Sequence, residues 1–375
     1  MSGAASVGPN GAQRGAVAIV FANLKGNLGD FAILHAMLAE AGRAFPERAL
    51  HVYSHPLHGV DAARMAAFRE RASAFDYRGP THGAPLGRLA MTALKLRLAP
   101  GGLAAAIRRR AAAWADRFAG FASYETVLVA GGEQWSGRQL GGLMFATLGA
   151  IRRQGVEVAA FPFSVKPSLF RLHSPSRLAS LFGALTRPLV TRDEASAVLL
   201  ARAGVPAETG VDSVFALADE AATVPPAADR DPDRVLLAAT GRADEVVAAA
   251  GRLLAAGLKV EALSTCVEED AETLAALRDR LGVVGHAPLT WQEVVAEFKA
   301  SRLVVTNRLH GVILGVLADA PLLPVANRTK VRSFVTGAGL DRHADDFAAL
   351  GGALAQAALA GRDDTLARMR AYHRR

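Results

Sequence analysis

The chain has 375 residues, of which 51% are hydrophobic and 21% are charged. This composition supports a large folded core and excludes an intrinsically disordered protein. The single cysteine, Cys266, excludes an intramolecular disulfide and a thiolate zinc site, and it fits a reducing, cytoplasmic setting. The apolar run over residues 16–22 is too short for a membrane span or a signal peptide, and we interpret it as a strand.

Positive charge is concentrated in the first half of the chain. Residues 1–190 carry 22 Lys and Arg against 10 Asp and Glu, whereas residues 191–375 carry 21 against 25. A basic half is typical of proteins that bind nucleic acid, an anionic membrane or a phosphorylated substrate. The alternative is a solvated surface rich in arginine, since the chain has 37 Arg and 6 Lys. Nucleic acid is disfavoured, because the basic residues are not interleaved with aromatic ones.

In chain order, the first half alternates between predicted strands and helices after a loose tail over residues 1–14. Strands are expected at 16–22, 49–53, 126–130, 156–161 and 188–191, and helices at 30–44, 65–74, 86–121 with a break at 100–102, 140–154, 177–185 and 194–203. Such alternation predicts a parallel sheet, so residues 15–217 should form a basic N-terminal α/β domain.

A proline-rich segment, residues 218–234, predicts a linker before the alternation resumes. Strands are then expected at 235–240, 259–263, 303–306 and 322–326, and helices at 243–255, 270–281, 291–300, 311–318 and in the tail from residue 345. Residues 235–375 should therefore form a second α/β domain. Ligands of such folds bind beyond the carboxyl ends of the strands, and we expect the site in a cleft between the domains.

The first candidate site is a turn with two glycines between the first strand and its helix. Gly26 and Gly29 flank Asn27, and free N–H groups at the helix start can bind an anion. Asp30 lies near this helix start, where its purely structural role would be to cap the helix. The turn lacks the Gly-Lys-Ser/Thr ending of a P-loop and the glycine spacing of a dinucleotide site.

The second candidate follows the strand at 126–130. Gly131 and Gly132 would let a ligand approach the backbone, Glu133 could contact sugar hydroxyls, and Trp135 could stack on a sugar ring. The alternative is a plain turn between a strand and a helix.

The third candidate is Arg192, at a strand end before an acidic helix start. Its planar, always charged guanidinium suits a carboxylate or a phosphate. The alternative is a surface salt bridge with Asp193 or Glu194, one of which would cap the helix.

The fourth candidate is the most informative segment of the chain. A buried strand runs into Asn307, Arg308, Leu309 and His310, and we expect a helix to start at Gly311. A fixed cation beside a titratable imidazole at a strand end suits an anionic substrate that needs proton transfer. The alternative is a structural histidine.

Two further clusters are weaker. His51, His55 and His58 have a metal-like spacing, but Pro56 prevents a common helix face and acidic ligands do not cluster nearby, so no metal site is expected. The basic stretch over residues 88–117 is either a solvated helix face or a surface that docks on an anionic membrane or a lipid-diphosphate-linked substrate.

Taken in order, these segments resemble the polysaccharide pyruvyl transferase family. The matching pieces are residues 26–30, the strand into Gly131-Gly132, residues 191–197 with 203–205, residues 211–213, and residues 306–311, followed by Ala320-Pro321, Lys330-Val331 and Phe334. The resemblance covers roughly residues 17–340, and the Arg308-Leu309-His310-Gly311 segment is its most specific part.

The resemblance implies two Rossmann-like parallel-sheet domains, similar to the glycosyltransferase type B architecture. The implied activity transfers pyruvate from phosphoenolpyruvate to a sugar of a surface polysaccharide or its precursor, as a cyclic ketal. The N-terminal domain would then be on the acceptor side. Arg192 and Arg308 would hold the donor, with Lys330 as a third cation, while His310 and Asp30 would be acid and base in either order. The substrate-binding set would be Gly26, Asn27, Gly29, Gly131, Gly132, Glu133, Asn307, Leu309 and Lys330.

This scheme requires no metal or organic cofactor, with phosphoenolpyruvate as the co-substrate, and it places the enzyme in the cytoplasm or at the inner face of the membrane. Two other functions stay open. A type B glycosyltransferase would use a nucleotide sugar and release a nucleotide. A non-catalytic relative would only bind a glycan or a lipid phosphate, although Arg192, Arg308, His310 and Asp30 together argue against it.

Overall fold

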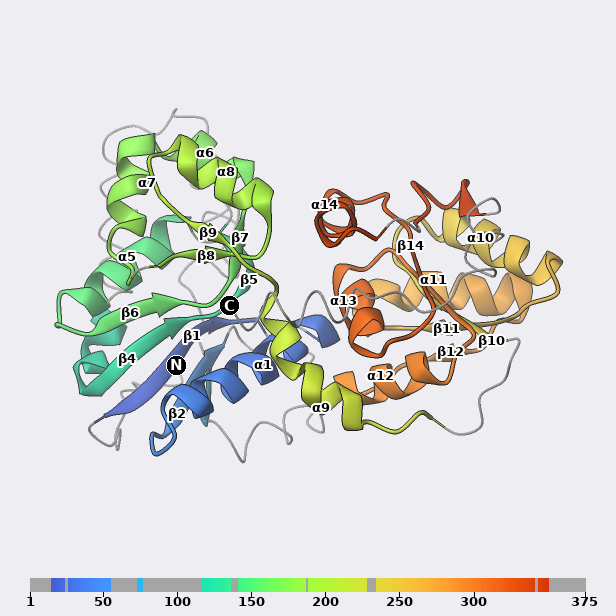
Figure 1. The fold of residues 1–375 in the computed structure, drawn as a ribbon, viewed down its shortest axis with the longest axis horizontal. Helices are drawn as coiled ribbons and strands as arrows, with labels where there is room; N and C mark the ends of the chain where they lie inside the picture. Colours follow the sequence, from blue (N-terminus) through green and yellow to red (C-terminus); the bar gives the residue numbers. More distant parts are fainter. Residues whose placement is uncertain are drawn as a thin grey trace, which may run out of the picture. The chain divides into compact units, whose positions relative to one another are not determined.

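The computed structural model describes residues 15–23, 26–54, 73–76, 116–135, 141–186, 188–227, 234–340 and 343–350 (Figure 1). These residues form two compact units. The first unit contains the described residues up to 212 except 26–39, which belong with residues 213–350 in the second. The tail predicted over residues 1–14, most of the helical tail predicted from residue 345, and most of the helices predicted over residues 65–74 and 86–121 lie outside the described residues. Residues 345–349 form bends and turns instead of the predicted helix.

The first unit is built on a sheet of five parallel strands in the order β3-β2-β1-β4-β6. The strands are β1 (Ala16–Ala22), β2 (Leu50–Ser54), β3 (Ser73–Asp76), β4 (Tyr124–Val129) and β6 (Glu157–Ala160). Every residue of the central strand β1 is buried, as expected for a parallel strand that is covered on both faces. The chain runs outward from β1 to β3 and then returns to β4, so the strand order reverses between β1 and β4.

A second, smaller sheet of the first unit was not predicted. Its strands are β5 (Gly132–Trp135), β7 (Phe163–Val165), β8 (Val190–Thr191) and β9 (Glu208–Thr209), in that order. The remaining elements of this unit are the 3-10 helix η1 (Asp116–Ser123) and helices α5 (Gly141–Arg152), α6 (Pro167–Leu172), α7 (Pro175–Phe182) and α8 (Glu194–Arg202). Residues 73 and 74, predicted as the end of a helix, belong to strand β3 instead.

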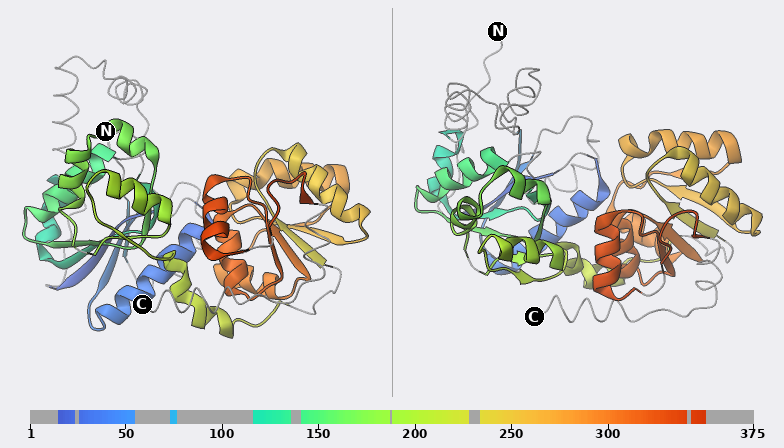
Figure 2. Two further views of the ribbon diagram at one scale, coloured as in Figure 1. Left: turned by 45° about the horizontal axis from the view of Figure 1, so that its top comes forward. Right: turned by 90° about the horizontal axis from the view of Figure 1, so that it is seen from above.

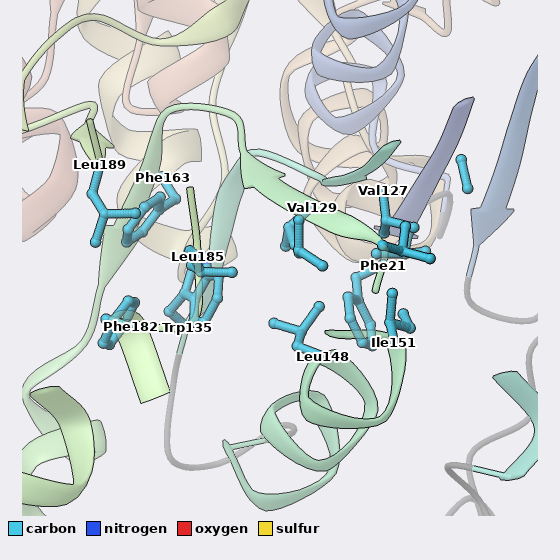
Figure 3. Close-up of a cluster of buried hydrophobic side chains, with 14 of the residues drawn as sticks. Phe21, Val127, Val129, Trp135, Leu148, Ile151, Phe163, Phe182, Leu185 and Leu189 are labelled. Atoms are coloured by element: carbon cyan, nitrogen blue, oxygen red, sulfur yellow. The ribbon is translucent and has the colours of Figure 1, made fainter. Parts of the chain in front are cut away.

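Trp135 lies in the hydrophobic core of the first unit (Figure 3). Its side chain packs against Phe163 and Phe182, with ring centroids 5.1 and 4.9 Å apart. Because only 1% of Trp135 is exposed, the prediction that it stacks on a sugar ring is wrong. Aromatic packing in the core accounts for this residue instead.

The second unit has its own sheet of five parallel strands in the order β12-β11-β10-β13-β14. The strands are β10 (Arg234–Ala238), β11 (Lys259–Leu263), β12 (Gly285–His286), β13 (Leu303–Thr306) and β14 (Leu322–Pro324). The helices are α10 (Ala243–Ala255), α11 (Val267–Leu281), α12 (Trp291–Lys299), α13 (Leu309–Leu317) and α14 (Thr329–Ala338). Helices α10 and α11 pack together on one face of the sheet, and α12 and α13 on the other (Figure 2). The strand order reverses between β10 and β13, the place where α/β sheets bind ligands.

The beginning of helix α1 (Leu28–Ala44) belongs to the second unit, although we expected it in the N-terminal domain. The Leu28 N–H donates to the Thr265 carbonyl at 2.8 Å, and Trp291 Nε1 donates to His35 Nδ1 at 3.2 Å. These bonds tie residues 28–35 to the loop after β11 and to α12.

The predicted linker over residues 218–234 is partly helical. Helix α9 (Ala218–Thr223) follows the 3-10 helix η2 (Ser213–Leu217). The Lys299 ammonium donates to the carbonyls of Ala221 at 2.7 Å and Val224 at 2.6 Å, so it satisfies the free carbonyls where α9 ends. A tertiary contact, rather than local sequence, therefore supports this short helix.

Candidate active site

The turn between β13 and α13 places the arginine and the histidine of the fourth candidate at the start of a helix. Helix α13 begins at Leu309, two residues before the predicted start, and Arg308 is its N-cap. Thr306 Oγ1 accepts the Arg308 N–H at 3.1 Å and donates to the Ala238 carbonyl at 2.6 Å. A Cβ atom at Gly311 would lie 2.4 Å from this oxygen, so the turn requires glycine there. His310 is consequently held in the first turn of α13.

Arg308 is buried and is fixed by two carboxylates of α11. One terminal nitrogen, Nη2, donates to Asp270, and the other, Nη1, donates to Glu269 Oε2 at 3.1 Å. Asp270 also accepts from Ser264 Oγ at 3.0 Å and from the Cys266 N–H at 3.2 Å. The buried Nε of Arg308 has no hydrogen-bond partner within the described part of the chain.

Neither carboxylate was predicted as a site residue from the sequence, where residue 270 is only the expected start of a helix. The acidic run over residues 268–270 follows the strand at 259–263. Its nearness to Arg308 depends on the strand order, in which β11 and β13 both flank β10.

The glycine turn of the first candidate lies against His310. A Cβ atom at Gly29 would be 2.0 Å from His310 Nδ1 and 2.3 Å from its Cγ, so only glycine permits this approach. Asn27 Oδ1 accepts the Gly29 N–H at 2.9 Å, and Asn27 forms an isolated antiparallel bridge with Cys266. Asp30 follows Gly29 in the first turn of α1. The second unit therefore brings the turn that carries Asp30 to the imidazole.

Three helices of the second unit begin in this neighbourhood. Helix α1 starts beside Thr265 and Cys266, α11 starts at the residue after Cys266, and α13 starts at the residue after Arg308. Helix starts favour anions through their free N–H groups and their dipoles. Thr265 Oγ1 is buried and has no hydrogen-bond partner among the residues described. The arrangement suits a ligand with phosphate or carboxylate groups.

The contacts of Asn307 and Leu309 support the structure of the site. Asn307 Oδ1 accepts the Thr240 N–H at 2.9 Å, and Nδ2 donates to the Thr240 carbonyl at 2.7 Å and to Asn327 Oδ1 at 3.2 Å. This amide joins the carboxyl ends of β10 and β13, while Leu309 lies in the core. Lys330 is exposed in the first turn of α14.

Cys266 is the N-cap of α11 and is buried. Burial raises the pKa of its thiol, which keeps the sulfur protonated and weakly nucleophilic at neutral pH. We therefore assign Cys266 no chemical role.

Arg192 lies in the first unit and is also buried. Its Nη1 donates to Asp212 Oδ2 at 2.7 Å, and its Nε donates to Ser164 Oγ at 2.6 Å. Asp193 caps α8 by accepting the Ser196 N–H at 2.8 Å. The predicted cap at Asp193 is confirmed, but the ion pair forms with Asp212 and is buried rather than on the surface. Asp212, in the Val211-Asp212-Ser213 segment singled out in the sequence, therefore supplies the counter-charge of Arg192.

The second candidate lies at the carboxyl end of β4, next to the reversal of strand order in the first sheet. Gly131 and Gly132 are buried, and Gly132 has a φ of 97°, which favours glycine. Glu133 is half-buried, and its carboxylate accepts from Lys166 Nζ at 3.1 Å. Gly131, Gly132 and Glu133 remain candidates for substrate binding in the first unit.

His51 belongs to a cluster with two tyrosines. Its Nδ1 lies 2.6 Å from the Tyr124 hydroxyl, which is 2.8 Å from the Tyr53 hydroxyl, and burial lowers the pKa of His51. His55 and His58 lie outside the described residues. In the part of the chain that the structure covers, no group of three His, Cys, Asp or Glu is arranged to bind a metal.

The described helices include none that is both long enough and apolar enough to cross a membrane. The basic stretch over residues 88–117, for which a solvated face and a membrane-docking surface were both considered, lies largely outside the described residues.

Two glycines of α1 give opposite predictions on one helix. Gly29→Ala should destabilise the protein by about 1–3 kcal/mol, because its Cβ would overlap the His310 ring and force a shift. Gly42→Ala should stabilise it by about 0.5–1 kcal/mol, because nothing lies within 4 Å of the added Cβ. Urea unfolding of both variants measures the difference. Equal stabilities would show that Gly29 does not need to pack against the imidazole.

Comparison with known proteins supports the fold. The structure of UDP-GlcNAc 2-epimerase from Methanocaldococcus jannaschii in complex with UDP-GlcNAc and UDP is similar, with a TM-score of 0.58, 11% identity, and coverage of 96% of this chain and 98% of that one. The α,α-trehalose 6-phosphate synthase from Burkholderia multivorans has a TM-score of 0.52, 14% identity, and coverage of 96% and 93%. No curated protein matches the chain by sequence.

The two parallel sheets and these likenesses confirm the predicted α/β fold of the glycosyltransferase type B kind. The chain is thus an α/β protein of two units, each built on a parallel sheet of five strands. The sequence profile of the polysaccharide pyruvyl transferases matches residues 27–329, and the chain belongs to that family.

Proposed function

We propose that this protein transfers pyruvate from phosphoenolpyruvate to two hydroxyls of a sugar, forming a cyclic ketal. The family supports polysaccharide pyruvylation in general. The observation that carries the proposal is the packing of the Gly29–Asp30 turn on His310, next to the buried Arg308. It brings an imidazole, a carboxylate-bearing turn and a fixed cation into one unit.

Phosphoenolpyruvate carries a phosphate and a carboxylate, so its site needs several donors. Arg308 supplies its Nε–H, Thr265 supplies its hydroxyl, and the starts of α1, α11 and α13 supply N–H groups. Lys330 and Arg192 remain candidate further cations, although Asp212 already neutralises Arg192.

The proton transfers have two named carriers. Asp30 takes the proton of the first sugar hydroxyl as the oxygen of that hydroxyl bonds to C2 of the enol, and His310 donates a proton to C3. Phosphate then leaves C2 with the proton that Asp30 took. The second hydroxyl bonds to C2 and gives its proton to His310, which closes the ketal and restores both groups. The roles of Asp30 and His310 can also be exchanged.

The acceptor is proposed from the fold. Gly131, Gly132 and Glu133 would contact the sugar, which we take to be a nucleotide- or lipid-linked precursor of an exopolysaccharide. A lipid-linked acceptor would place the enzyme on the cytoplasmic surface of the membrane.

A second candidate function is glycosyl transfer from a nucleotide sugar. The fold favours it, because the similar epimerase structure holds UDP-GlcNAc and UDP. The two functions differ in the released product, which is phosphate for pyruvyl transfer and a nucleotide for glycosyl transfer.

The test is incubation with phosphoenolpyruvate and a panel of lipid-linked and nucleotide-linked sugars, with phosphate release as the readout. We expect acceptor-dependent release of phosphate and a sugar product that gains the mass of a pyruvate ketal. Arg308→Lys should raise KM for the donor, because lysine lacks the planar fork. Nucleotide release without phosphate release would support the glycosyltransferase instead.

A further inference from the structure

The two carboxylates on Arg308 differ sharply in their surroundings. The Asp270 side chain is 2% exposed and has two further donors, Ser264 Oγ and the Cys266 N–H. The Glu269 side chain is 61% exposed. Within the described part of the chain, its carboxylate contacts Arg308 and no other side chain. The contact between Asp270 and Arg308 is therefore a fixed part of the structure, whereas the Glu269 side chain can rotate into water at little cost in free energy.

The charges around Arg308 are unbalanced before any substrate binds. The Arg308 guanidinium contacts two carboxylates, so these three groups together carry one net negative charge. An anionic donor that approaches Arg308 would meet this charge at short range, where repulsion opposes binding. An incoming oxyanion could replace Glu269 at Nη1 of Arg308. Among the described residues, Glu269 is the only exposed carboxylate that contacts this guanidinium.

We propose that Glu269 is a displaceable stand-in for the substrate anion. Its carboxylate occupies Nη1 of Arg308 in the empty protein and leaves when a phosphate or carboxylate group of the donor takes that position. Glu269 thus lowers the affinity for the donor and keeps the guanidinium oriented between turnovers. This inference rests on the proposed function, since it takes Arg308 as the donor-binding cation.

The test compares two neutralising substitutions in the same turn of α11. Glu269→Gln removes the competing charge. Glu268→Gln removes a neighbouring charge that is also exposed and makes no ion pair within the described part of the chain. Calorimetric titration with phosphoenolpyruvate should give a Kd about 3- to 10-fold lower for Glu269→Gln than for the wild type. The Glu268→Gln variant should change the Kd by less than about 2-fold, because solvent and salt screen that charge. The KM for phosphoenolpyruvate should follow the Kd in both variants.

Arg308→Lys separates the two ways in which the proposal can fail. If the wild type binds phosphoenolpyruvate, Arg308→Lys weakens that binding and Glu269→Gln leaves it unchanged or weaker, Glu269 is not a competitor and the proposed function stands. If the wild type binds neither phosphoenolpyruvate nor inorganic phosphate, the donor site itself is wrong and both proposals are overturned. Equal tightening by Glu268→Gln and Glu269→Gln would reduce the effect to general charge and overturn the specific role.

Discussion

Replacement of His310 by glutamine should lower kcat for pyruvyl transfer by about 100- to 10,000-fold, the usual contribution of one positioned proton-transfer group. Glutamine can form hydrogen bonds but does not titrate, so KM for phosphoenolpyruvate should change little. The position supports this expectation, because His310 lies in the first turn of α13 and Gly29 packs against its ring. Steady-state phosphate release, with the donor and acceptor varied in turn, measures both constants.

A matched control is His286→Gln in the same unit. His286 lies on the edge strand β12 and pairs with Glu261, with 2.9 Å between Nε2 and Oε2. We expect its kcat to equal that of the wild type. If His310→Gln also keeps a near-normal kcat, the histidine only binds or supports, and the acid has to be sought first at Asp30 and Glu133.

The Asp212→Asn variant should lose about 3–5 kcal/mol of unfolding free energy, the second large effect that we expect. The substitution leaves the Arg192 guanidinium buried without its counter-charge, and an uncompensated buried ion is far costlier than a broken surface pair. The two side chains are 5% and 3% exposed and only 2.7 Å apart. The shift in the urea unfolding midpoint of the first unit, followed by tryptophan fluorescence, measures the loss because Trp135 reports on its core.

Glu125→Gln is the control for burial. Arg48 and Glu125 are in the same unit at a similar distance, 2.9 Å, but their side chains are 47% and 42% exposed. Breaking this pair should cost less than about 1 kcal/mol. Similar losses in the two variants would mean that the Arg192 pair is solvated in solution.

The elements of the second unit follow closely from its sequence. The predicted helix at 243–255 and strand at 259–263 coincide with α10 and β11, because both are long enough for hydrophobic periodicity to be readable. The strands of the small sheet in the first unit have two to four residues, too few to show any period, and they were mostly missed.

The candidate site could be predicted only where it is local. Gly29, Arg308 and His310 stood out because each follows a strand, and the carboxyl ends of strands are where ligands bind. The partners of the arginines did not stand out, because they depend on strand order. Asp270 reaches Arg308 only since β11 and β13 both flank β10, a fact that no local pattern contains.

The discontinuous second unit has a consequence for making chimeras with relatives. A cut after Asp212 looks like a natural place to exchange the C-terminal half, yet residues 26–39 pack with that half. In a hybrid joined there, residues 26–39 would pack against a C-terminal half from a relative. The hydrogen bonds that Leu28 and His35 make with Thr265 and Trp291 would form only if the relative has suitable residues at those positions. Functional hybrids should therefore require that residues 26–39 be transplanted along with the C-terminal half.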